Sequence, residues 1–276
     1  MKNAFVIGHP IAHSLSPVLH GFWLKKYGID GFYKAIDVPP DELNQFTSRL
    51  RSGEFVGGNV TLPHKQAIFD LCDEIDPDAR TIGAVNTLIM RDEKLVGSNT
   101  DHLGFAANLD QMAPGWDEKK GTAIVLGAGG AARAVLVALA VRGFTQIHIL
   151  NRSAQKARDL ANELPGPFSG HALNEFAELA GAIHLLVNTT SIGMHGTSFD
   201  NLPLSALPKS ALITDIVYTP LITPLLADAQ KAGLRIVDGL GMLLHQAVPG
   251  FEAWFGTRPE VTSELRDLLI EKLRQS

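Results

Sequence analysis

The sequence predicts an α/β protein of two domains, and three observations support this prediction. Short β-rich runs alternate with helical patterns along the 276 residues, as in sheets built from strand-helix-strand units. A polar stretch with Pro and Gly, residues 108–121, interrupts the alternation and is predicted to be a linker. A buried strand, a glycine turn and a helix then follow at 122–143, so a second domain is expected to begin there.

Before the linker, strand and helix signals follow each other in regular order. The expected strands are 4–8, 32–38, 55–62, 84–90 and 94–99, and the expected helices are 16–28, 40–53, 65–75 and 102–109. Ser16 and Pro17 have the residue types of an N-cap and a first helical position, and Gly28 that of a terminator. Strands that alternate with helices favour a parallel sheet.

After the linker the same order continues. The expected strands are 122–126, 146–153, 182–191, 211–218 and 234–239, and a helix is expected at 223–233. In the tail, 262–273, four leucines fall on one helical face, which predicts a packing helix; they are Leu265, Leu268, Leu269 and Leu273.

Composition excludes several classes of protein. The formal net charge of −5, without a basic run, lacks the electrostatic signature of a nucleic-acid partner. No stretch approaches a membrane span, and the apolar run at the N-terminus is too short for a signal peptide. The single cysteine, Cys72, cannot form an intrachain disulfide, and the histidines show no ligand spacing such as HExxH. We therefore expect a cytoplasmic protein without a metal site or a membrane partner.

The stretch GAGGAA, 127–132, fits the fingerprint of a dinucleotide-binding turn. Gly127 suits the tight turn, Gly129 lets the backbone approach a pyrophosphate, and Ala132 is small where the helix meets the strand. The N-terminus of the following helix offers N–H groups to an anion. A purely structural turn between a strand and a helix is the alternative interpretation.

The end of the next strand predicts which dinucleotide is preferred. NAD enzymes usually place Asp or Glu there, on the ribose 2′-hydroxyl. Here Asn151 and Arg152 stand at that position, and Lys156 adds a charge one turn later. This pattern favours NADP over NAD, although an exposed arginine with no role in binding would look the same.

Three polar stretches in the first half also follow or precede likely strands. Asn59, Thr61 and Lys65 lie in GGNVTLPHK, Asn86 in GAVNT and Asp101 in GSNTD. Because ligands in α/β sheets bind beyond the carboxyl ends of strands, these side chains are predicted to converge on one site. Each also has a structural explanation, as a turn or a helix cap. A lysine and a carboxylate meet the need of ketone reduction for charge stabilisation and proton transfer.

Taken together, these stretches resemble the shikimate dehydrogenase family over nearly the whole chain. The matching stretches, in the family's order, are GHPIAHSLSPVLH, GGNVTLPHK, GAVNT, GSNTD, GAGGAAR, NRS, VNTTSIGM, DIVYTPLITPLL and GLGMLLHQA. The resemblance implies reversible, NADP-dependent reduction of 3-dehydroshikimate to shikimate, a step of aromatic amino-acid biosynthesis. A small-molecule substrate is the implied partner, and the sequence leaves a homodimer open.

The resemblance also implies roles for individual residues. Lys65 and Asp101 are the implied acid/base pair. The implied substrate-binding residues are Ser14, Ser16, Asn59, Thr61, Lys65, Asn86, Asp101, Tyr218 and Gln246. From the fingerprint and the resemblance together, the expected cofactor-binding residues are Gly127, Ala128, Gly129, Gly130, Ala131, Asn151, Arg152, Ser153, Lys156, Thr189, Ile216, Gly239 and Met242.

The family's fold implies a discontinuous substrate domain, residues 1–106 closed by C-terminal helices at 240–276. A Rossmann-type NADP-binding domain would span 107–239, with the active-site cleft between the two domains. Three positions depart from the family's common residues: Gly21 replaces an Asn, Ser153 a Thr, and His102 a small residue.

Two other functions stay open. A quinate/shikimate dehydrogenase that prefers NAD is one, and Arg152 without an acidic neighbour argues against it. A catalytically silent NADP-binding regulator on the same fold is the other. The presence of both Lys65 and Asp101 argues against that second function, because a pure binder needs no proton-transfer pair.

Overall fold

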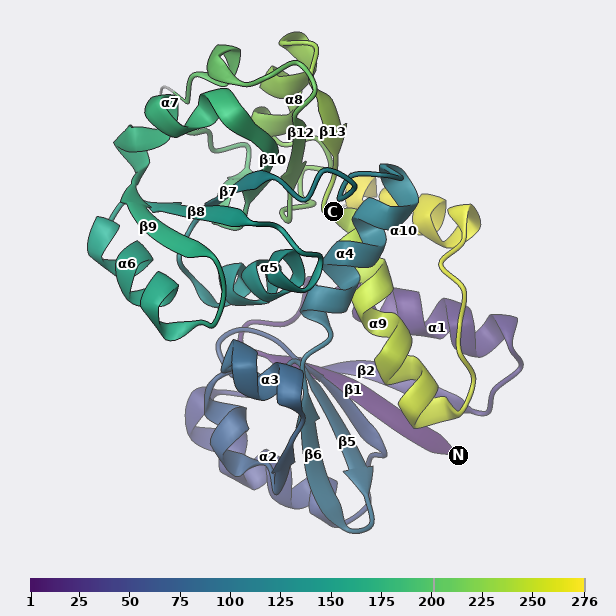
Figure 1. Ribbon diagram of the computed structural model, residues 1–276. Helices are drawn as coiled ribbons and strands as arrows, with labels where there is room; N and C mark the ends of the chain where they lie inside the picture. Colours follow the sequence, from purple (N-terminus) through teal and green to yellow (C-terminus); the bar gives the residue numbers. More distant parts are fainter. Residues whose placement is uncertain (201, 276) are drawn as a thin grey trace. The chain divides into compact units, whose positions relative to one another are not determined.

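A computed structural model describes residues 1–200 and 202–275, so the last residue of the predicted 240–276 segment lies outside the described ranges. The chain forms two compact units. The first consists of Met1–Thr100 and Leu244–Gln275, and the second of Asp101–Leu243. Each unit is built on a six-stranded sheet (Figure 1). The predicted class, α/β in both parts of the chain, is confirmed.

The sheet of the first unit has the order β2-β1-β3-β5-β6-β4. Its strands are β1 (Lys2–Gly8), β2 (Gly31–Asp37), β3 (Gly57–Val60), β4 (Glu74–Ile75), β5 (Thr87–Arg91) and β6 (Lys94–Ser98). The expectation of a parallel sheet is wrong for β5, which runs antiparallel to both β3 and β6. Asp92 and Glu93, both at positive φ (50° and 64°), close a two-residue hairpin, and so short a connection cannot join parallel strands.

Helices cover both faces of this sheet. They are α1 (Ser16–Lys26), α2 (Leu43–Arg51), α3 (Pro77–Ile82), α9 (Leu240–Phe255) and α10 (Ser263–Gln275), with short 3-10 turns at Pro40–Glu42 and Ala67–Leu71. Figure 1 shows α2 and α3 on one face and α1 and α9 on the other. Under α2, Phe5 meets Phe46 and Phe55 edge to face, at centroid distances of 4.9 and 5.1 Å. Such edge-to-face contacts help to hold this core.

Two local predictions for the first unit are wrong. Ser16 is the first helical residue of α1 and not its N-cap, which is Leu15. The helix expected at 65–75 is only the 3-10 turn Ala67–Leu71, after which the chain extends into β4. The reason is pairing with β6: the backbone N–H of Asp73 donates to the carbonyl of Leu95, at 2.8 Å. Tertiary pairing thus overrides a local helical pattern.

The sheet of the second unit is parallel throughout, in the order β13-β12-β10-β7-β8-β9. Its strands are β7 (Thr122–Leu126), β8 (Gln146–Asn151), β9 (Phe168–Ala172), β10 (Ile183–Asn188), β12 (Leu212–Asp215) and β13 (Arg235–Val237); a short strand, β11 (Ile192–His195), lies outside this sheet. Numbered along the chain, this is the 3-2-1-4-5-6 order of doubly wound dinucleotide-binding domains. Its switch point lies between β7 and β10, directly beside the glycine turn.

Two apolar cores lie on opposite faces of this second sheet. Val125 and Ile149 belong to one core, whereas Ile124 and Leu150 belong to the other. The helices are α4 (Asp101–Met112), α5 (Gly130–Val141), α6 (Ala154–Glu163), α7 (Phe176–Leu179) and α8 (Pro224–Lys231), with 3-10 turns at Leu173–Glu175, Ala180–Ala182 and Leu204–Ala206. Among the helices of the described ranges, none combines the length and apolar character that a membrane span requires.

The prediction of a linker at 108–121 is wrong in its first part. Helix α4 continues to Met112, and the rest of the stretch packs onto the second unit. Trp116 is buried, stacks on Phe144 at 5.7 Å and donates its indole N–H to Asp110, at 2.9 Å. Arg142 lies over the same indole and pairs with Asp110 and Asp117. These contacts explain why a polar, Pro- and Gly-containing segment forms part of a folded unit.

Candidate active site

The first sheet brings two of the predicted site residues to one edge. Asn59 is in β3, directly opposite Thr87 of β5, and Asn86 immediately precedes Thr87. Because β5 is antiparallel to β3, the start of β5 lies beside the end of β3. The gathering of polar residues at this edge therefore depends on the hairpin and not on two parallel carboxyl ends.

Buried amides meet at this edge. Asn86 is 2% exposed, and its Nδ2 donates to Oε1 of Gln246 in α9, at 3.4 Å. Asn59 accepts a hydrogen bond from the Tyr33 hydroxyl at 2.6 Å and donates Nδ2 to the carbonyl of Asn86 at 3.2 Å. The side-chain amide of Asn59 is thus engaged on both sides by protein groups.

The turn after β3 places Thr61 and Lys65. The turn is anchored by two backbone bonds and one side chain: Thr61 N–H donates to the Ile7 carbonyl at 2.9 Å, and Val85 N–H to the Lys65 carbonyl at 2.8 Å. The imidazole of His64 donates Nε2–H to the Val38 carbonyl, at 2.7 Å. His64 is buried, whereas Thr61 and Lys65 are half-buried. Lys65 therefore sits in a fixed turn, and not at the helix start that the sequence predicts.

The two glycines before this turn have a steric reason. A Cβ on Gly58 would collide with the carbonyl and ring of Phe5, and one on Gly57 with the carbonyl of Leu88 and the indole of Trp254. β3 can therefore run between its neighbours only with hydrogen at these two positions. The GG pair serves packing, and the polar residues that follow it are the candidates for chemistry.

The remaining first-half residues lie at helix starts. Ser16 N–H donates to Oγ of Ser14 at 3.3 Å, at the start of α1, and Ser16 is 6% exposed. Asp101 is the first residue of α4 and is 9% exposed. By its contacts Asp101 belongs to the second unit, whereas Lys65 belongs to the first.

The glycine turn of the second unit has the shape that a pyrophosphate needs. Gly127 has φ +107°, and a Cβ there would lie 2.8 Å from Thr189 Oγ1. In contrast, a Cβ on Gly129 or Gly130 would meet nothing within 4 Å. Gly129 is also the N-cap of the 12-residue helix α5 and provides no side-chain cap. An open surface before uncapped N–H groups fits a bound anion.

The residues expected around the adenosine ribose lie at the end of β8. Asn151 is half-buried and donates Nδ2 to the carbonyl of Ser153, at 3.1 Å. Ser153 caps α6, because its Oγ accepts from the N–H of Lys156 at 3.4 Å. Arg152 and Lys156 are both exposed. Two cations thus flank a polar turn, an arrangement suited to a phosphate.

The residues expected near the nicotinamide surround the ends of β10 and β12. Thr189 Oγ1 donates to the Leu126 carbonyl at 2.7 Å, and Ile216 N–H donates to the Asn188 carbonyl at 3.1 Å. Buried Asp215 accepts from Asn188 Nδ2 at 2.9 Å, from Val217 N–H at 2.9 Å and from the Thr223 hydroxyl at 2.7 Å. This carboxylate ties the two strand ends together, although burial raises its pKa.

Three other predicted residues of the second unit lie beside these strand ends. A Cβ on Gly239 would collide with the carbonyl of Ile216, and Met242 N–H donates to the Gly239 carbonyl at 3.1 Å. Tyr218 is half-buried, and burial raises its pKa.

Two further predicted cofactor residues belong to the glycine turn and the start of α5. Ala128 packs against the apolar core, and Ala131 lies in the first turn of α5.

The residues that the structure describes offer neither a metal-binding cluster nor a reactive thiol. Within residues 1–200 and 202–275, no group of three or more His, Cys, Asp or Glu side chains is placed to hold a metal ion. Burial raises the pKa of Cys72 to about 12, so its thiol stays protonated at neutral pH.

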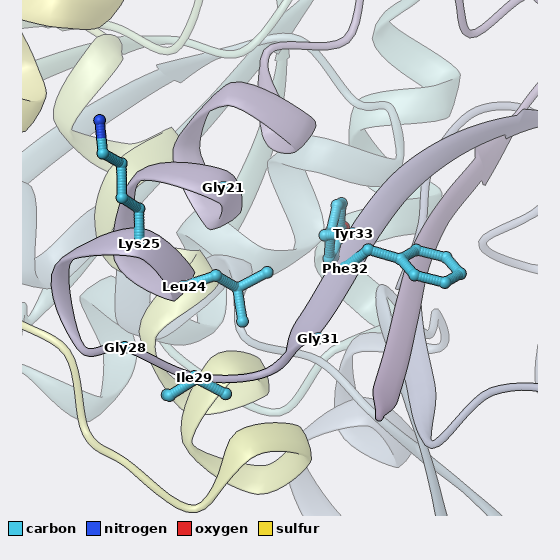
Figure 2. Close-up of a pocket in the computed structure, with 8 residues that line it drawn as sticks. All are labelled: Gly21, Leu24, Lys25, Gly28, Ile29, Gly31, Phe32 and Tyr33. Carbon is cyan, nitrogen blue, oxygen red and sulfur yellow. The ribbon is translucent and has the colours of Figure 1, made fainter.

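A separate cavity of about 470 Å³ lies on the first unit (Figure 2). It is lined by Gly21, Leu24 and Lys25 of α1, by Gly28 and Ile29 of the following turn, and by Gly31, Phe32 and Tyr33 of β2. None of these is a predicted site residue. A Cβ on Gly21 would meet nothing within 4 Å, so a larger side chain here would project into open space.

Comparison with known proteins identifies the family. A shikimate dehydrogenase substrate-binding domain matches residues 6–88, a shikimate/quinate 5-dehydrogenase domain residues 110–241, and a shikimate 5′-dehydrogenase C-terminal domain residues 239–263. The shikimate dehydrogenase (NADP+) of Chelativorans sp. is 52% identical over 99% of this chain and 97% of its own. The chain belongs to the shikimate dehydrogenase family.

Two solved structures of the family extend the comparison. Shikimate 5-dehydrogenase of Thermus thermophilus, in complex with NADP(H) and shikimate, has a TM-score of 0.85 and 36% identity, and the match covers 100% of this chain and 99% of that one. Quinate dehydrogenase of Corynebacterium glutamicum, in complex with NAD, has a TM-score of 0.89 and 28% identity over 98% of this chain and 99% of that one. The predicted resemblance to the shikimate dehydrogenase family is therefore confirmed, and of these two structural neighbours one holds NADP(H) and the other NAD.

Sequence patterns missed three residues that bond to the amides of the candidate site. Tyr33, Thr87 and Thr100 all bond to the amides described above. Thr87 and Thr100 stand in the quoted stretches GAVNT and GSNTD, directly after Asn86 and directly before Asp101. Their position next to predicted site residues is the signal that could have found them.

Proposed function

We propose that the protein reduces 3-dehydroshikimate to shikimate with NADPH and catalyses the reverse oxidation with NADP. The observation that carries the proposal is its 52% identity, over 99% of the chain, to a shikimate dehydrogenase (NADP+). The presence of Lys65 and Asp101 and the open glycine turn before α5 agree with this function. We also propose that the protein is cytoplasmic, which cell fractionation would test, and that it forms a homodimer, which light scattering would test.

Lys65 and Asp101 are the proposed acid/base pair. Reduction of a ketone places negative charge on the oxygen, which an ammonium group stabilises and protonates. The oxidation needs a base that accepts the proton of the alcohol. The bond from Val85 N–H to the Lys65 carbonyl fixes the backbone from which this side chain extends, so only the side-chain torsions remain to be ordered for the reaction.

The substrate-binding role is assigned mainly to residues of the first unit. Ser14, Ser16 and Thr61 provide hydroxyl groups suited to a carboxylate, whereas Asn86 and Gln246 provide amides suited to ring hydroxyls. Asn59 holds Asn86 and Tyr33 in place through its own amide. From the second unit, we assign Tyr218 and Asp101 to the same substrate.

The cofactor-binding role is assigned to the second unit. NADPH, when bound, supplies the hydride. Gly127, Ala128, Gly129, Gly130 and Ala131 would hold the pyrophosphate, and Thr189, Ile216, Gly239 and Met242 the nicotinamide end. Asn151, Arg152, Ser153 and Lys156 would hold the 2′-phosphate end, where the paired cations favour NADP over NAD.

A second candidate is a quinate/shikimate dehydrogenase that uses NAD. The structural likeness to the NAD-bound quinate dehydrogenase of C. glutamicum favours this candidate. Arg152 opposes it, because no carboxylate stands at the end of β8 for a free 2′-hydroxyl.

The test follows nicotinamide absorbance with shikimate and quinate, each with NADP and with NAD. We expect kcat/KM for shikimate with NADP to be at least about tenfold higher than kcat/KM for the other three combinations. A charge-assisted contact between Arg152 and the 2′-phosphate predicts a difference of this size. Comparable rates with NAD or quinate would support the second candidate. Absence of all four activities in folded, NADP-binding protein would favour a silent regulator.

A further inference from the structure

Five hydrogen bonds link residues of the first unit in a single line. The Tyr33 hydroxyl donates to Asn59 Oδ1 at 2.6 Å, and Asn59 Nδ2 donates to Thr87 Oγ1 at 3.3 Å. The Thr87 hydroxyl donates to Asn86 Oδ1 at 2.8 Å, and Asn86 Nδ2 donates to Thr100 Oγ1 at 3.1 Å. The Thr100 hydroxyl donates to the backbone carbonyl of Gln246 at 2.7 Å. The line therefore runs from the edge strand β2 to helix α9.

The direction of every bond is determined from the Gln246 end. A backbone carbonyl can only accept, so the single hydroxyl proton of Thr100 is used there, at 2.7 Å. The longer contact from Thr100 Oγ1 to Asn86 Oδ1, at 3.3 Å, cannot use the same proton. The Thr100 oxygen is then an acceptor for Asn86 Nδ2.

The same reasoning fixes the amide of Asn86. Its Oδ1 receives the backbone N–H of Thr100 at 2.9 Å and the Thr87 hydroxyl at 2.8 Å. A flipped amide would place its NH₂ group against the N–H of Thr100, a donor that cannot accept. Thr87, having donated, must accept from Asn59, which leaves Asn59 Oδ1 for the Tyr33 hydroxyl.

Burial makes this orientation costly to lose. Thr87, Asn86 and Thr100 are 1%, 2% and 4% exposed, so water cannot replace a missing partner easily. We infer that Thr87 and Thr100 are positioning residues, which fix the Asn86 amide with its NH₂ group toward Gln246 and so orient the two amides that the proposed function assigns to the substrate.

This inference rests on the proposed function and gives it a basis for specificity. With Asn86 Nδ2 directed at Gln246 Oε1, at 3.4 Å, the second amide is oriented as well. Two amides of fixed orientation recognise a ring hydroxyl by whether it donates or accepts each hydrogen bond, and not by its size alone. Shape-selective pockets reject an altered hydroxyl far less than oriented polar groups do.

Thr100→Val removes the hydroxyl and keeps the shape, whereas Thr100→Ser keeps the hydroxyl. In Thr100→Val we expect KM for shikimate to rise about tenfold, with kcat and KM for NADP within about threefold of wild type. Thr100→Ser should restore KM to within about threefold. Thr47→Val is the matched control, since buried Thr47 also donates to a backbone carbonyl, of Asn44 at 2.8 Å, but lies outside the line.

Comparing two substrates in wild type and variant, as in a double-mutant cycle, separates a positioning role from a general structural defect. Of the three shikimate analogues that each lack one ring hydroxyl, one should give wild type and Thr100→Val the same KM, because its interaction with the two amides is already absent. A Thr100→Val variant with unchanged KM for shikimate, or a Thr47→Val variant with the same tenfold rise, would overturn the inference.

A measurement without turnover covers the case in which the protein proves inactive on shikimate. The side-chain NH₂ signals of Asn86, assigned with Asn86→Asp, should exchange slowly with solvent in the wild-type protein. In Thr100→Val they should exchange at least about tenfold faster, because the acceptor is lost. Equal exchange in both proteins would reject the positioning role, whether or not the proposed function holds.

Discussion

His20, on α1, is a buried imidazole for which the structure predicts a measurable dependence of stability on pH. The ring is fully buried and stacks on Tyr33 at 3.9 Å, with Trp23, Phe251 and Trp254 around it. Neither ring nitrogen makes a hydrogen bond of good geometry within the described ranges. Burial lowers the pKa from 6.5 to about 3, and the Asn59 side chain raises it by less. The imidazole is therefore neutral in the folded protein at pH 5.

The sign and size of the effect follow from linkage. Because the folded pKa lies below the unfolded one, protons bind the unfolded chain first as the pH falls through about 6.5. Stability contributed by neutral His20 is complete above that pH and is lost progressively down to about pH 3. Between pH 7.5 and pH 5.0 the loss is about 2 kcal/mol in the free energy of unfolding.

The assay compares wild type with His20→Phe, which fills the aromatic stack without a titrating group. Urea unfolding in a Trp116→Phe background reports the first unit through Trp23 and Trp254, and is measured at pH 7.5 and 5.0. The difference in stability between the two proteins should shift by about 2 kcal/mol in favour of His20→Phe at the lower pH. A constant difference across both pH values, or an NMR titration of His20 near pH 6.5, would refute the reasoning.

Five further variants test the site, two of them as controls. Lys65→Ala should lower kcat about 100-fold or more, while KM for shikimate changes little. As a control, substitution of the exposed Lys94 by Ala should leave both kcat and KM unchanged. Normal turnover in Lys65→Ala would remove Lys65 from the mechanism. Arg152→Ala should weaken NADP about 10- to 100-fold and spare NAD, and an equal loss for both dinucleotides would contradict its role. Gly129→Ala should raise KM for NADP without lowering the melting temperature, because its Cβ would meet only open space. Gly127→Ala should lower the melting temperature, because the glycine there has φ +107°. The reverse pattern would reject the assignment of the glycine turn to the cofactor.

Features that depend on neighbouring residues in the chain were predictable from sequence. The glycine turn follows β7 and opens α5 as its spacing indicates, and Gly28 has the positive φ of a helix terminator. The end of β8 falls at Asn151, so the adjoining Arg152 could be placed beforehand. Such signals are local, because each reflects the conformation of a few consecutive residues.

Features that depend on pairing between distant segments were not predictable. The apolar pattern near Cys72 suggests a helix, but β6 offers its backbone groups and the chain extends to meet them. Strand β9 has only half-buried residues and so lacks a clear apolar signal. Thr87 and Thr100 gain their importance only when Asn86 and Gln246, 160 positions apart in the chain, become neighbours.

The first unit draws its last helices from the C-terminal end of the chain, and this fixes when it can be completed during synthesis. The Trp254 indole N–H donates to the Leu88 carbonyl at 2.9 Å, and the ring packs against Gly57 and Gly250. When only residues 1–243 have emerged from the ribosome, the second unit is contiguous and accessible, but the first unit lacks this side chain. Completion of the first unit therefore requires residues 244–275 to emerge, while the second unit can fold earlier. Nascent chains of increasing length, probed by proteolysis, would show the second unit protected first.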